Sequence, residues 1–403
     1  MSFQPPKGTD DLLAPRSEPW REALRLWERW SATYGYPLVM TPIFEATELF
    51  ERGVGDYTDV VTKQMYSFED KSGRKLTLRP EGTAAVVRAY LDSGNQGSWK
   101  GAYSGPFFRY ERPQAGRRRQ FWQVGVEYLD VESAEADVEV VELGYRYLQA
   151  VGVREMVLLL NTLGDGNCRP GYIEELRQYL LGKESELTDD SVRLITTNPL
   201  RVLDSKVDAP VVADAPRIVD HLCDACASHY ERVKDLLEEV GVPYIEDPRL
   251  VRGLDYYTRT TFEYVSRGLD SAQNAVGGGG RYDGLAESLG GRSVPGVGFA
   301  LGMDRIILSS DGTGNGSLDA YLVSETGPRD GLVVASKLRE AGVAVDFDSE
   351  GRSVKAQFRS ARRAGAPVTL VWKGEGELVD IQTEGDRAEL ALDALPGWFE
   401  DRS

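Results

Sequence analysis

The chain contains few cysteines and no long hydrophobic run, and both absences narrow the class of protein. Three cysteines among 403 residues are too few for a disulfide framework, which is typical of a reducing compartment. No apolar stretch approaches the length that spans a bilayer. The opening segment MSFQPPKGTDDLL also lacks the basic and apolar regions of a secretory signal. We therefore expect a cytoplasmic protein that has no membrane partner.

The chain has fewer basic than acidic residues: it contains 47 Lys and Arg and 64 Asp and Glu, and its net charge is −17. Phosphate binding scales with the cations that a surface presents, so this balance argues against a general nucleic-acid coat. Small basic patches can still meet RNA, because salt screens charges beyond about 8–10 Å. No P-loop motif occurs, and the run Gly277–Gly280 lacks the spacing of a dinucleotide fingerprint.

The cations that are present gather in one segment. Residues 103–110 and 121–128 have the extended, alternating pattern of strands. The loop between them is punctuated by Pro and Gly and carries four arginines: Arg112, Arg117, Arg118 and Arg119. This pattern predicts an antiparallel hairpin with a basic tip. Arg donates two parallel hydrogen bonds and stays charged, so the hairpin suits an anion such as phosphate; an ordinary solvated surface hairpin is the alternative.

Apolar spacing predicts the organisation of the first three quarters of the chain. Ser17 to Tyr34 has the pattern of an amphipathic helix, and Leu38 to Met40 is expected to form a strand. Helical patterns at 172–181 and 218–240 alternate with polar turns. They indicate a mainly helical insertion.

A separate domain is expected at the carboxyl end. Residues 309–317 are rich in Gly, Ser and Asn and lack apolar side chains, which is typical of a flexible linker. Beyond it, strand and helix patterns alternate: strand 320–323, helix 331–341, strand 343–347, helix 354–364 and strand 368–372. This order predicts a small α/β domain with a largely parallel sheet.

Five sequence blocks occur in order along the chain. Residues 78–83 read LRPEGT, residues 108–127 contain FRYERP and GRRRQFWQVGVE, and residues 251–257 read VRGLDYY. Residues 278–285 (GGGRYDGL) and 298–305 (GFALGMDR) follow. This set resembles the class II aminoacyl-tRNA synthetases, in the form found in the histidyl-tRNA synthetase family, and the resemblance covers almost the whole chain.

The resemblance implies an enzyme that activates histidine with ATP, taken as its Mg²⁺ complex, and then transfers histidine to the 3′ end of its tRNA. It implies a homodimer, with residues 30–42 at the interface. The implied catalytic residues are Arg109 and Arg252. In the family, Arg252 bridges the substrate carboxylate and the α-phosphate, which is work that other class II enzymes give to a metal ion. A buried ion pair with Asp255 is the alternative for this arginine.

The resemblance also implies three sets of binding residues. Those for ATP are Arg109 on the α-phosphate, Glu111 on the adenine edge, Phe121 stacking on adenine and Arg305 on the γ-phosphate side. Those for histidine are Glu81, Thr83 and Gln123 for the amino group and Glu127 and Tyr257 for the ring, with Tyr282 lining the pocket. Those for tRNA are Arg112, Gln114, Arg117 and Arg119 at the acceptor end and Arg352, Lys355, Gln357 and Arg359 at the anticodon, with Phe358 as a stacking surface or as core.

One group of residues falls outside the five blocks: His221, Cys223, Cys226 and His229, with Cys168 earlier in the chain. A C-x-x-C pair near two histidines can hold zinc. If residues 218–240 form one helix, the two cysteines are simply neighbours on it, and buried cysteine behaves as a small hydrophobe. We expect no metal in the active site, and structural zinc at Cys223 and Cys226 stays the lesser alternative.

The expected fold is α+β: a class II antiparallel sheet flanked by helices, a helical insertion and a C-terminal α/β anticodon-binding domain. The expected boundaries are 1–160 and 248–308 for the catalytic domain, 161–247 for the insertion, 309–317 for the linker and 318–403 for the anticodon-binding domain. The alternative function is that of a non-catalytic synthetase paralogue that regulates the first enzyme of histidine biosynthesis, and a tRNA-binding sensor is a third. Such paralogues tend to lose motif residues, whereas Arg109, Arg252 and Arg305 are present.

Overall fold

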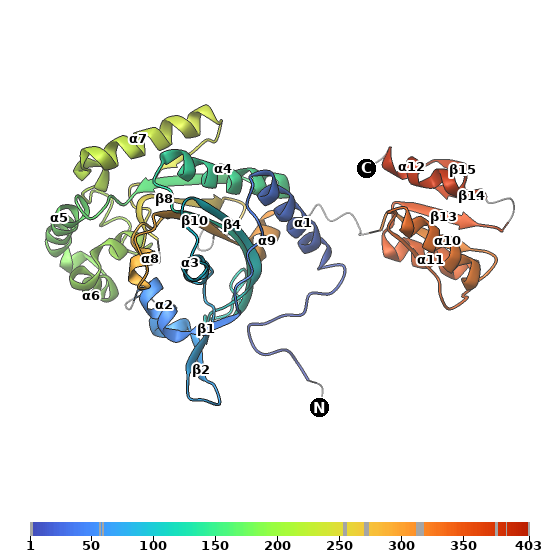
Figure 1. The fold of residues 1–403 in the computed structure, drawn as a ribbon, viewed down its shortest axis with the longest axis horizontal. Helices are drawn as coiled ribbons and strands as arrows, with labels where there is room; N and C mark the ends of the chain where they lie inside the picture. Colours follow the sequence, from blue (N-terminus) through green and yellow to red (C-terminus); the bar gives the residue numbers. More distant parts are fainter. Residues whose placement is uncertain are drawn as a thin grey trace. The chain divides into compact units, whose positions relative to one another are not determined.

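The structure, a computed structural model, describes residues 3–55, 58, 60–252, 256–269, 274–311, 318–374, 378–383 and 385–401. The chain divides into two compact units, one of residues 1–11 and 23–312 and the other of residues 12–22 and 313–403 (Figure 1). None of the helices in these described stretches combines the length and the apolar composition that crossing a membrane requires.

A seven-stranded sheet forms the centre of the first unit, in the order β4-β5-β10-β9-β8-β6-β7. Neighbouring strands are antiparallel except β6 and β7, which are parallel. The strands are β4 (Trp99–Phe108), β5 (Gln120–Leu129), β6 (Met156–Thr162), β7 (Ile245–Glu246), β8 (Thr258–Ser266), β9 (Ala275–Arg281) and β10 (Gly296–Gly302). The predicted antiparallel sheet is therefore present, and β4 and β5 form the predicted hairpin.

The centre of this sheet depends on the glycine run of β9. A Cβ atom at Gly278 would lie 2.4 Å from the carbonyl oxygen of Phe262, and one at Gly279 would lie 1.9 Å from that of Gly298. Both distances are shorter than any side chain tolerates. Only glycine lets β8, β9 and β10 pack at this spacing, so this part of the sheet presents bare backbone.

Helices cover both faces of the sheet. Helix α3 (Thr83–Asp92) lies within the curve of the sheet, and α4 (Ala134–Val151) lies along its outer face (Figure 1). The ring of Trp27, on α1 (Glu18–Thr33), packs edge-on against Tyr147 of α4 and Phe299 of β10, with centroids 5.2 and 6.0 Å apart. Helix α1 confirms the amphipathic helix predicted at 17–34. The other helices of this part are α2 (Thr47–Val54), α8 (Leu285–Ser288) and α9 (Met303–Ser309).

The strand predicted at residues 38–40 is wrong. The structure has an isolated bridge there, between Leu38 and Ala102. Ala102 exchanges backbone hydrogen bonds with Val39 and Pro37, and proline has no N–H with which to extend the ladder. The nearest strand begins later, in a three-stranded sheet of β1 (Phe44–Ala46), β3 (Lys75–Leu78) and β2 (Tyr66–Glu69).

The insertion is mainly helical, as expected, and consists of α5 (Arg169–Leu181), α6 (Asp189–Thr197), α7 (Asp224–Glu239) and short 3₁₀ turns at 184–186, 199–204 and 218–221. The single helix predicted at 218–240 is wrong. Its first turn ends at His221, Cys223 is extended (φ −69°, ψ 160°), and α7 begins after it. The break has a packing cause, because Ile218 joins the core that includes α5, whereas Tyr230 is buried on α7, which packs on α4.

The second unit holds a five-stranded sheet in the order β12-β11-β13-β14-β15. Its strands are β11 (Ala320–Ser324), β12 (Val345–Phe347), β13 (Val368–Trp372), β14 (Leu378–Gln382) and β15 (Arg387–Ala391), and its helices are α10 (Pro328–Glu340), α11 (Val354–Ala364) and α12 (Leu395–Glu400). The three strands predicted from the sequence are parallel, and the two that follow are antiparallel. Of the predicted linker 309–317, Ser309 belongs to α9, and residues 312–317 lie outside the described residues.

Candidate active site

A cavity of about 230 Å³ opens over the glycine run of β9. Its walls come from distant segments: the start of α3, the β4–β5 hairpin, the residues before β8, and parts of β8, β10 and α9. The predicted site residues that line it are Glu81, Thr83, Arg109, Glu111, Arg117, Phe121, Gln123, Arg252, Tyr257 and Arg305. The cavity therefore joins the sequence blocks that were singled out separately.

Two arginines of the cavity are held by fixed oxygen acceptors. Arg109 Nε donates to the carbonyl oxygen of Pro80 at 2.8 Å, and its guanidinium lies 5.3 Å from the centre of the Phe121 ring. Arg305 Nη1 donates to the carbonyl oxygen of Ala275 at 2.5 Å. Burial lowers the pKa of both arginines, but an arginine pKa starts so high that both stay charged at neutral pH. An anion that enters the cavity meets two positioned cations.

Arg252 is paired on one side and open on the other. Its Nη1 lies 2.5 Å from the Glu263 carboxylate of β8. Burial is the largest single effect and lowers the pKa of Arg252, but the Glu263 charge together with Tyr257 and Tyr256 outweighs it, so that the pKa is raised overall. Arg252 Nε and Gln123 Oε1 are both buried without a hydrogen-bond partner among the described residues. A buried donor and a buried acceptor left open in one cavity indicate a ligand that supplies both partners; Asp255, the alternative partner, lies outside the described residues.

Glu81 is fixed by the helix that follows it. Its carboxylate oxygens accept the backbone N–H groups of Thr83 at 2.7 Å and Ala84 at 3.0 Å, at the start of α3. Unpaired N–H groups at a helix start carry partial positive charge and favour a carboxylate. Burial nevertheless raises the pKa of Glu81. A substrate ammonium group would relieve the cost of that buried charge.

Glu127 and Tyr282 do not line the cavity but lie behind its wall. The Glu127 carboxylate accepts hydrogen bonds from Thr83 Oγ1 at 2.8 Å, from Tyr103 at 3.4 Å and from Tyr282. It is fully buried, and burial raises the pKa of Glu127 to about 8, although the Tyr282 and Thr83 hydroxyls lower it. At neutral pH this network therefore holds a proton that a solvated glutamate would release.

Replacing Glu127 by glutamine is expected to change how stability depends on pH. The folded chain keeps a proton on Glu127 up to about pH 8, whereas the unfolded chain releases it near 4.5. Between these values the free energy of unfolding of the wild type should fall, by a few kcal/mol, relative to Glu127→Gln. Urea unfolding from pH 5 to 9 measures the difference. Glu132→Gln, at an exposed carboxylate, is the control, and parallel profiles for wild type and Glu127→Gln would contradict the assignment.

The hairpin tip presents its predicted tRNA residues in two ways. Arg112, Gln114 and Arg117 are exposed, and a turn fixes the tip because Gln114 and Arg117 exchange backbone hydrogen bonds at 3.1 and 2.9 Å. Arg119 is half-buried, with its guanidinium 3.9 Å from the centre of the Tyr110 ring. Arg118, to which no role was given, pairs with Asp304 at 2.9 Å. These contacts hold the hairpin tip in place, and Arg112 and Arg117 remain exposed to solvent.

The predicted anticodon residues separate into exposed and buried ones. Arg352, Lys355 and Arg359 are exposed. Gln357 is buried, where it accepts from the Ser324 N–H at 2.9 Å and donates to the carbonyls of Ser324 and Arg352. The prediction that Gln357 contacts nucleic acid is therefore corrected, because its amide is used to join α11 to β11. Phe358 is half-buried against the core of this unit, so the core alternative holds for it.

Two side chains of the cavity bear on the site although sequence reasoning gave them no role. Glu263 supplies the partner of Arg252, and Tyr256 lines the wall beside Tyr257, with ring centroids 4.7 Å apart. A charged residue inside the otherwise apolar stretch FEYV of β8 was the signal for Glu263. Tyr256 stood within the VRGLDYY block next to a residue that was assigned.

An antiparallel sheet with one arginine directly after the first strand of its hairpin, a second arginine in the first turn of helix α9 and a cavity that both arginines line is the arrangement of a class II aminoacyl-tRNA synthetase. The family model of histidyl-tRNA synthetase matches residues 8–306, and that of the anticodon-binding domain matches residues 329–398. The chain belongs to the histidyl-tRNA synthetase family and is an ATP-dependent histidine–tRNA ligase.

Individual relatives agree with this assignment over their whole length. The histidine–tRNA ligase of Halothermothrix orenii is 46% identical over 410 residues, which cover 97% of each chain. That of Geobacillus kaustophilus is 42% identical and covers 100% of this chain and 99% of its own. The crystal structure of apo histidyl-tRNA synthetase from S. aureus matches with a TM-score of 0.76 and 36% identity, over 99% of this chain and 100% of its own. The regulatory-paralogue alternative is not favoured, since these full-length relatives are ligases.

Proposed function

We propose that the cavity holds histidine and ATP side by side, with Arg252 between the carboxylate of histidine and the α-phosphate of ATP. A carboxylate oxygen of histidine attacks the α-phosphorus, the new P–O bond forms, and pyrophosphate leaves. The single observation that carries this proposal is the pair of open buried atoms, the donor Arg252 Nε and the acceptor Gln123 Oε1. An amino acid can pair with both atoms, because its carboxylate accepts a hydrogen bond from Arg252 Nε and its ammonium group donates one to Gln123 Oε1.

The ATP side of the cavity would be organised by charge. Arg109 is proposed to bind the α-phosphate, with adenine against Phe121 and Glu111, and Arg305 is proposed to bind the γ-phosphate side. Both guanidiniums are already fixed on backbone carbonyls, so they need little reorganisation when charge develops in the transition state. Mg²⁺ would enter with ATP as part of the substrate.

The histidine side would recognise an ammonium group and an aromatic ring. Glu81, Thr83 and Gln123 are proposed to bind the amino group. Glu127, Tyr257 and Tyr282 are proposed to select the imidazole ring, with Glu127 acting through the hydroxyl groups that it holds. A site built from buried polar groups rejects an amino acid that cannot pair with them.

Transfer to tRNA would use both units of the chain. A hydroxyl of the terminal adenosine attacks the carbonyl carbon of histidyl-adenylate, and AMP leaves. Arg112, Gln114, Arg117 and Arg119 are proposed to contact the acceptor end, and Arg352, Lys355 and Arg359 the anticodon. We propose that the protein acts in the cytoplasm, because tRNA is aminoacylated in the compartment where it is used.

ATP–pyrophosphate exchange against a panel of amino acids tests this proposal. Exchange with histidine alone is the expected result, and the same preparation should charge the matching tRNA. The proposal would be contradicted if no amino acid supported exchange, or if another amino acid supported it better than histidine.

We propose that the chain is a homodimer through residues 30–42, extended by the adjoining residues 43 and 44. Four apolar side chains of this segment are exposed in the single chain: Leu38 (69%), Met40 (85%), Ile43 (45%) and Phe44 (51%). Several exposed apolar side chains in one short segment are typical of a protein–protein contact, and two-fold symmetry is its commonest arrangement.

Light scattering at micromolar concentration is expected to give twice the 44.6 kDa mass of one chain. Met40→Glu should shift the mass toward the monomer, since it places a charge in the apolar contact. Val207→Glu is the matched control, because Val207 is another strongly exposed apolar residue (75%) elsewhere in the chain. A wild-type mass of 44.6 kDa would refute the dimer.

A further inference from the structure

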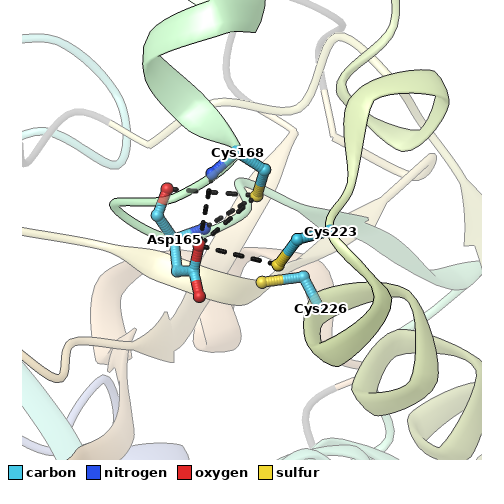
Figure 2. A group of neighbouring side chains, drawn as sticks. All are labelled: Asp165, Cys168, Cys223 and Cys226. Carbon is cyan, nitrogen blue, oxygen red and sulfur yellow. Dashed lines mark hydrogen bonds between the residues drawn. The ribbon is translucent and has the colours of Figure 1, made fainter.

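The three cysteines of the chain converge on one aspartate. The ligand atoms of Asp165, Cys168, Cys223 and Cys226 all lie within 4.8 Å of one another. Figure 2 shows the four side chains pointing toward one another, from the loop before α5 and from the start of α7. The two histidines that neighbour the cysteines in sequence lie elsewhere, since His229 pairs with Asp137 at 2.7 Å and His221 with Glu175 at 3.6 Å.

We propose that these four residues bind a structural zinc ion. Thiolate sulfur is the ligand that zinc prefers, and four ligands in a tetrahedron complete a structural site. With Zn–S bonds of about 2.3 Å, the ligand atoms of such a site stand about 3.8 Å apart. The present spacing needs only a small contraction to reach it. The sequence spacing D-x-x-C and C-x-x-C is that of two metal-binding turns.

The backbone around the site is shaped for a metal-bound sulfur. The Asp165 N–H points at Cys168 Sγ, with a nitrogen–sulfur distance of 3.3 Å, and an N–H donor stabilises a thiolate. Gly164 is required in the turn: its φ is +61°, and a Cβ atom there would lie 2.6 Å from Cys168 Sγ. This glycine therefore leaves space around the sulfur atom.

The surrounding charges favour an anionic ligand set. Cys168 and Cys223 occupy the cap positions of α5 and α7, and Cys226 lies in the first turn of α7. The positive ends of both helices therefore face the sulfurs, which favours thiolates. Arg259 lies 3.7 Å from Asp165 and adds a cation beside the carboxylate. Zinc with three thiolates and one carboxylate would carry excess negative charge, and these groups offset it.

The site would fasten the insertion to the active site. It joins the start of α5 to the start of α7, which are more than fifty positions apart in the chain. Arg169 follows Cys168 directly and donates to the carbonyl oxygen of Tyr257 at 2.5 Å, and Tyr257 lines the cavity. Zinc would therefore fix the base of the helical insertion and, through Arg169, one wall of the histidine pocket.

Metal analysis of the full-length chain, purified with a thiol reductant and without a metal-affinity tag, tests the proposal. Mass spectrometry of the metal content should find about one zinc per chain. After exchange for Co²⁺, the absorption spectrum should show sulfur-to-cobalt charge transfer and the visible bands of tetrahedral cobalt. Cys223→Ser and Cys226→Ser should reduce the zinc content at least tenfold. His221→Asn is the matched control and should keep the metal.

A second measurement on the wild type covers the case in which the serine variants fail to fold. A mercurial reagent that attacks the thiols should release zinc in proportion as the three cysteines react. Three free thiols in a metal-free protein would overturn the proposal, and so would a disulfide among them, seen as a mass loss of two hydrogens. Zinc that survives Cys226→Ser would also overturn it. ATP–pyrophosphate exchange takes no part in these readouts, so they are independent of the proposed activity.

Discussion

Arg252→Ala is expected to lower the rate of histidyl-adenylate formation by several orders of magnitude, equivalent to about 3–5 kcal/mol of transition-state stabilisation. Negative charge builds up between the attacking carboxylate and the α-phosphate, and the Arg252 guanidinium is the cation that we place there. Its open Nε donor can bind the substrate in both the ground state and the transition state, but its charge counts most in the transition state. Histidine binding should therefore weaken less than the chemical step slows.

Single-turnover kinetics, which separate binding from chemistry, measure the effect. Arg249→Ala is the matched control, because Arg249 is an exposed arginine nearby whose carboxylate partner is Asp247 at 3.7 Å. The double variant Arg252→Ala/Glu263→Gln separates two causes of a loss. If the unpaired Glu263 charge were the cause, the double variant would recover activity; we expect that it does not. Near-normal chemistry in Arg252→Ala would mean that the residue is structural.

A chain that ends at Gly316 is expected to keep ATP–pyrophosphate exchange and to lose tRNA charging, on the order of a hundredfold or more. All groups that we assign to activation lie between Glu81 and Arg305, whereas the anticodon contacts lie on α11 and just before it. Two binding sites on one tRNA reinforce each other, and removal of one site forfeits that gain. Exchange and aminoacylation measured on the same preparation test the prediction.

Charge reversal in the intact chain gives the same test without a deletion. Lys355→Glu/Arg359→Glu should weaken charging about tenfold or more through lost phosphate contacts, while exchange stays unchanged. Lys337→Glu, at an exposed lysine of α10 in the same unit, is the control. If tRNA charging were unchanged in both the truncated chain and the double variant, the anticodon contacts that we propose for the residues after Gly316 would be contradicted.

Local patterns predicted the parts of the fold that depend on local physics. Alternation and Pro/Gly punctuation were enough for the β4–β5 hairpin, and the predicted helix 354–364 and strand 368–372 match α11 and β13 residue for residue. Pairings between distant segments were out of reach. Glu263 meets Arg252 because the chain returns through β8 beside Gly278, and Glu127 meets Tyr282 across 155 positions. The periodicity of apolar residues along the chain does not predict contacts between segments that are distant in sequence.

The errors came from segments where tertiary packing overrides a local pattern. Residues 218–240 have one helical rhythm, but their apolar side chains pack on two different cores, so the chain breaks at Cys223. That break is what brings Cys223 within reach of Asp165. Gln357 looked like a surface polar residue, and only the buried backbone of Ser324 explains its amide.

The glycine run of β9 has a consequence for inhibitors and resistance. A compound seated on the floor of the cavity would rest on the backbone of Gly277 and Gly278. The smallest substitution at either position places a methyl group 2.5 Å or less from a carbonyl oxygen of a neighbouring strand, Ala300 or Phe262. A mutant that altered this floor would therefore disrupt its own sheet. Resistance mutations would therefore have to change the walls of the cavity. The side chains of those walls are also the ones that we assign to substrate binding.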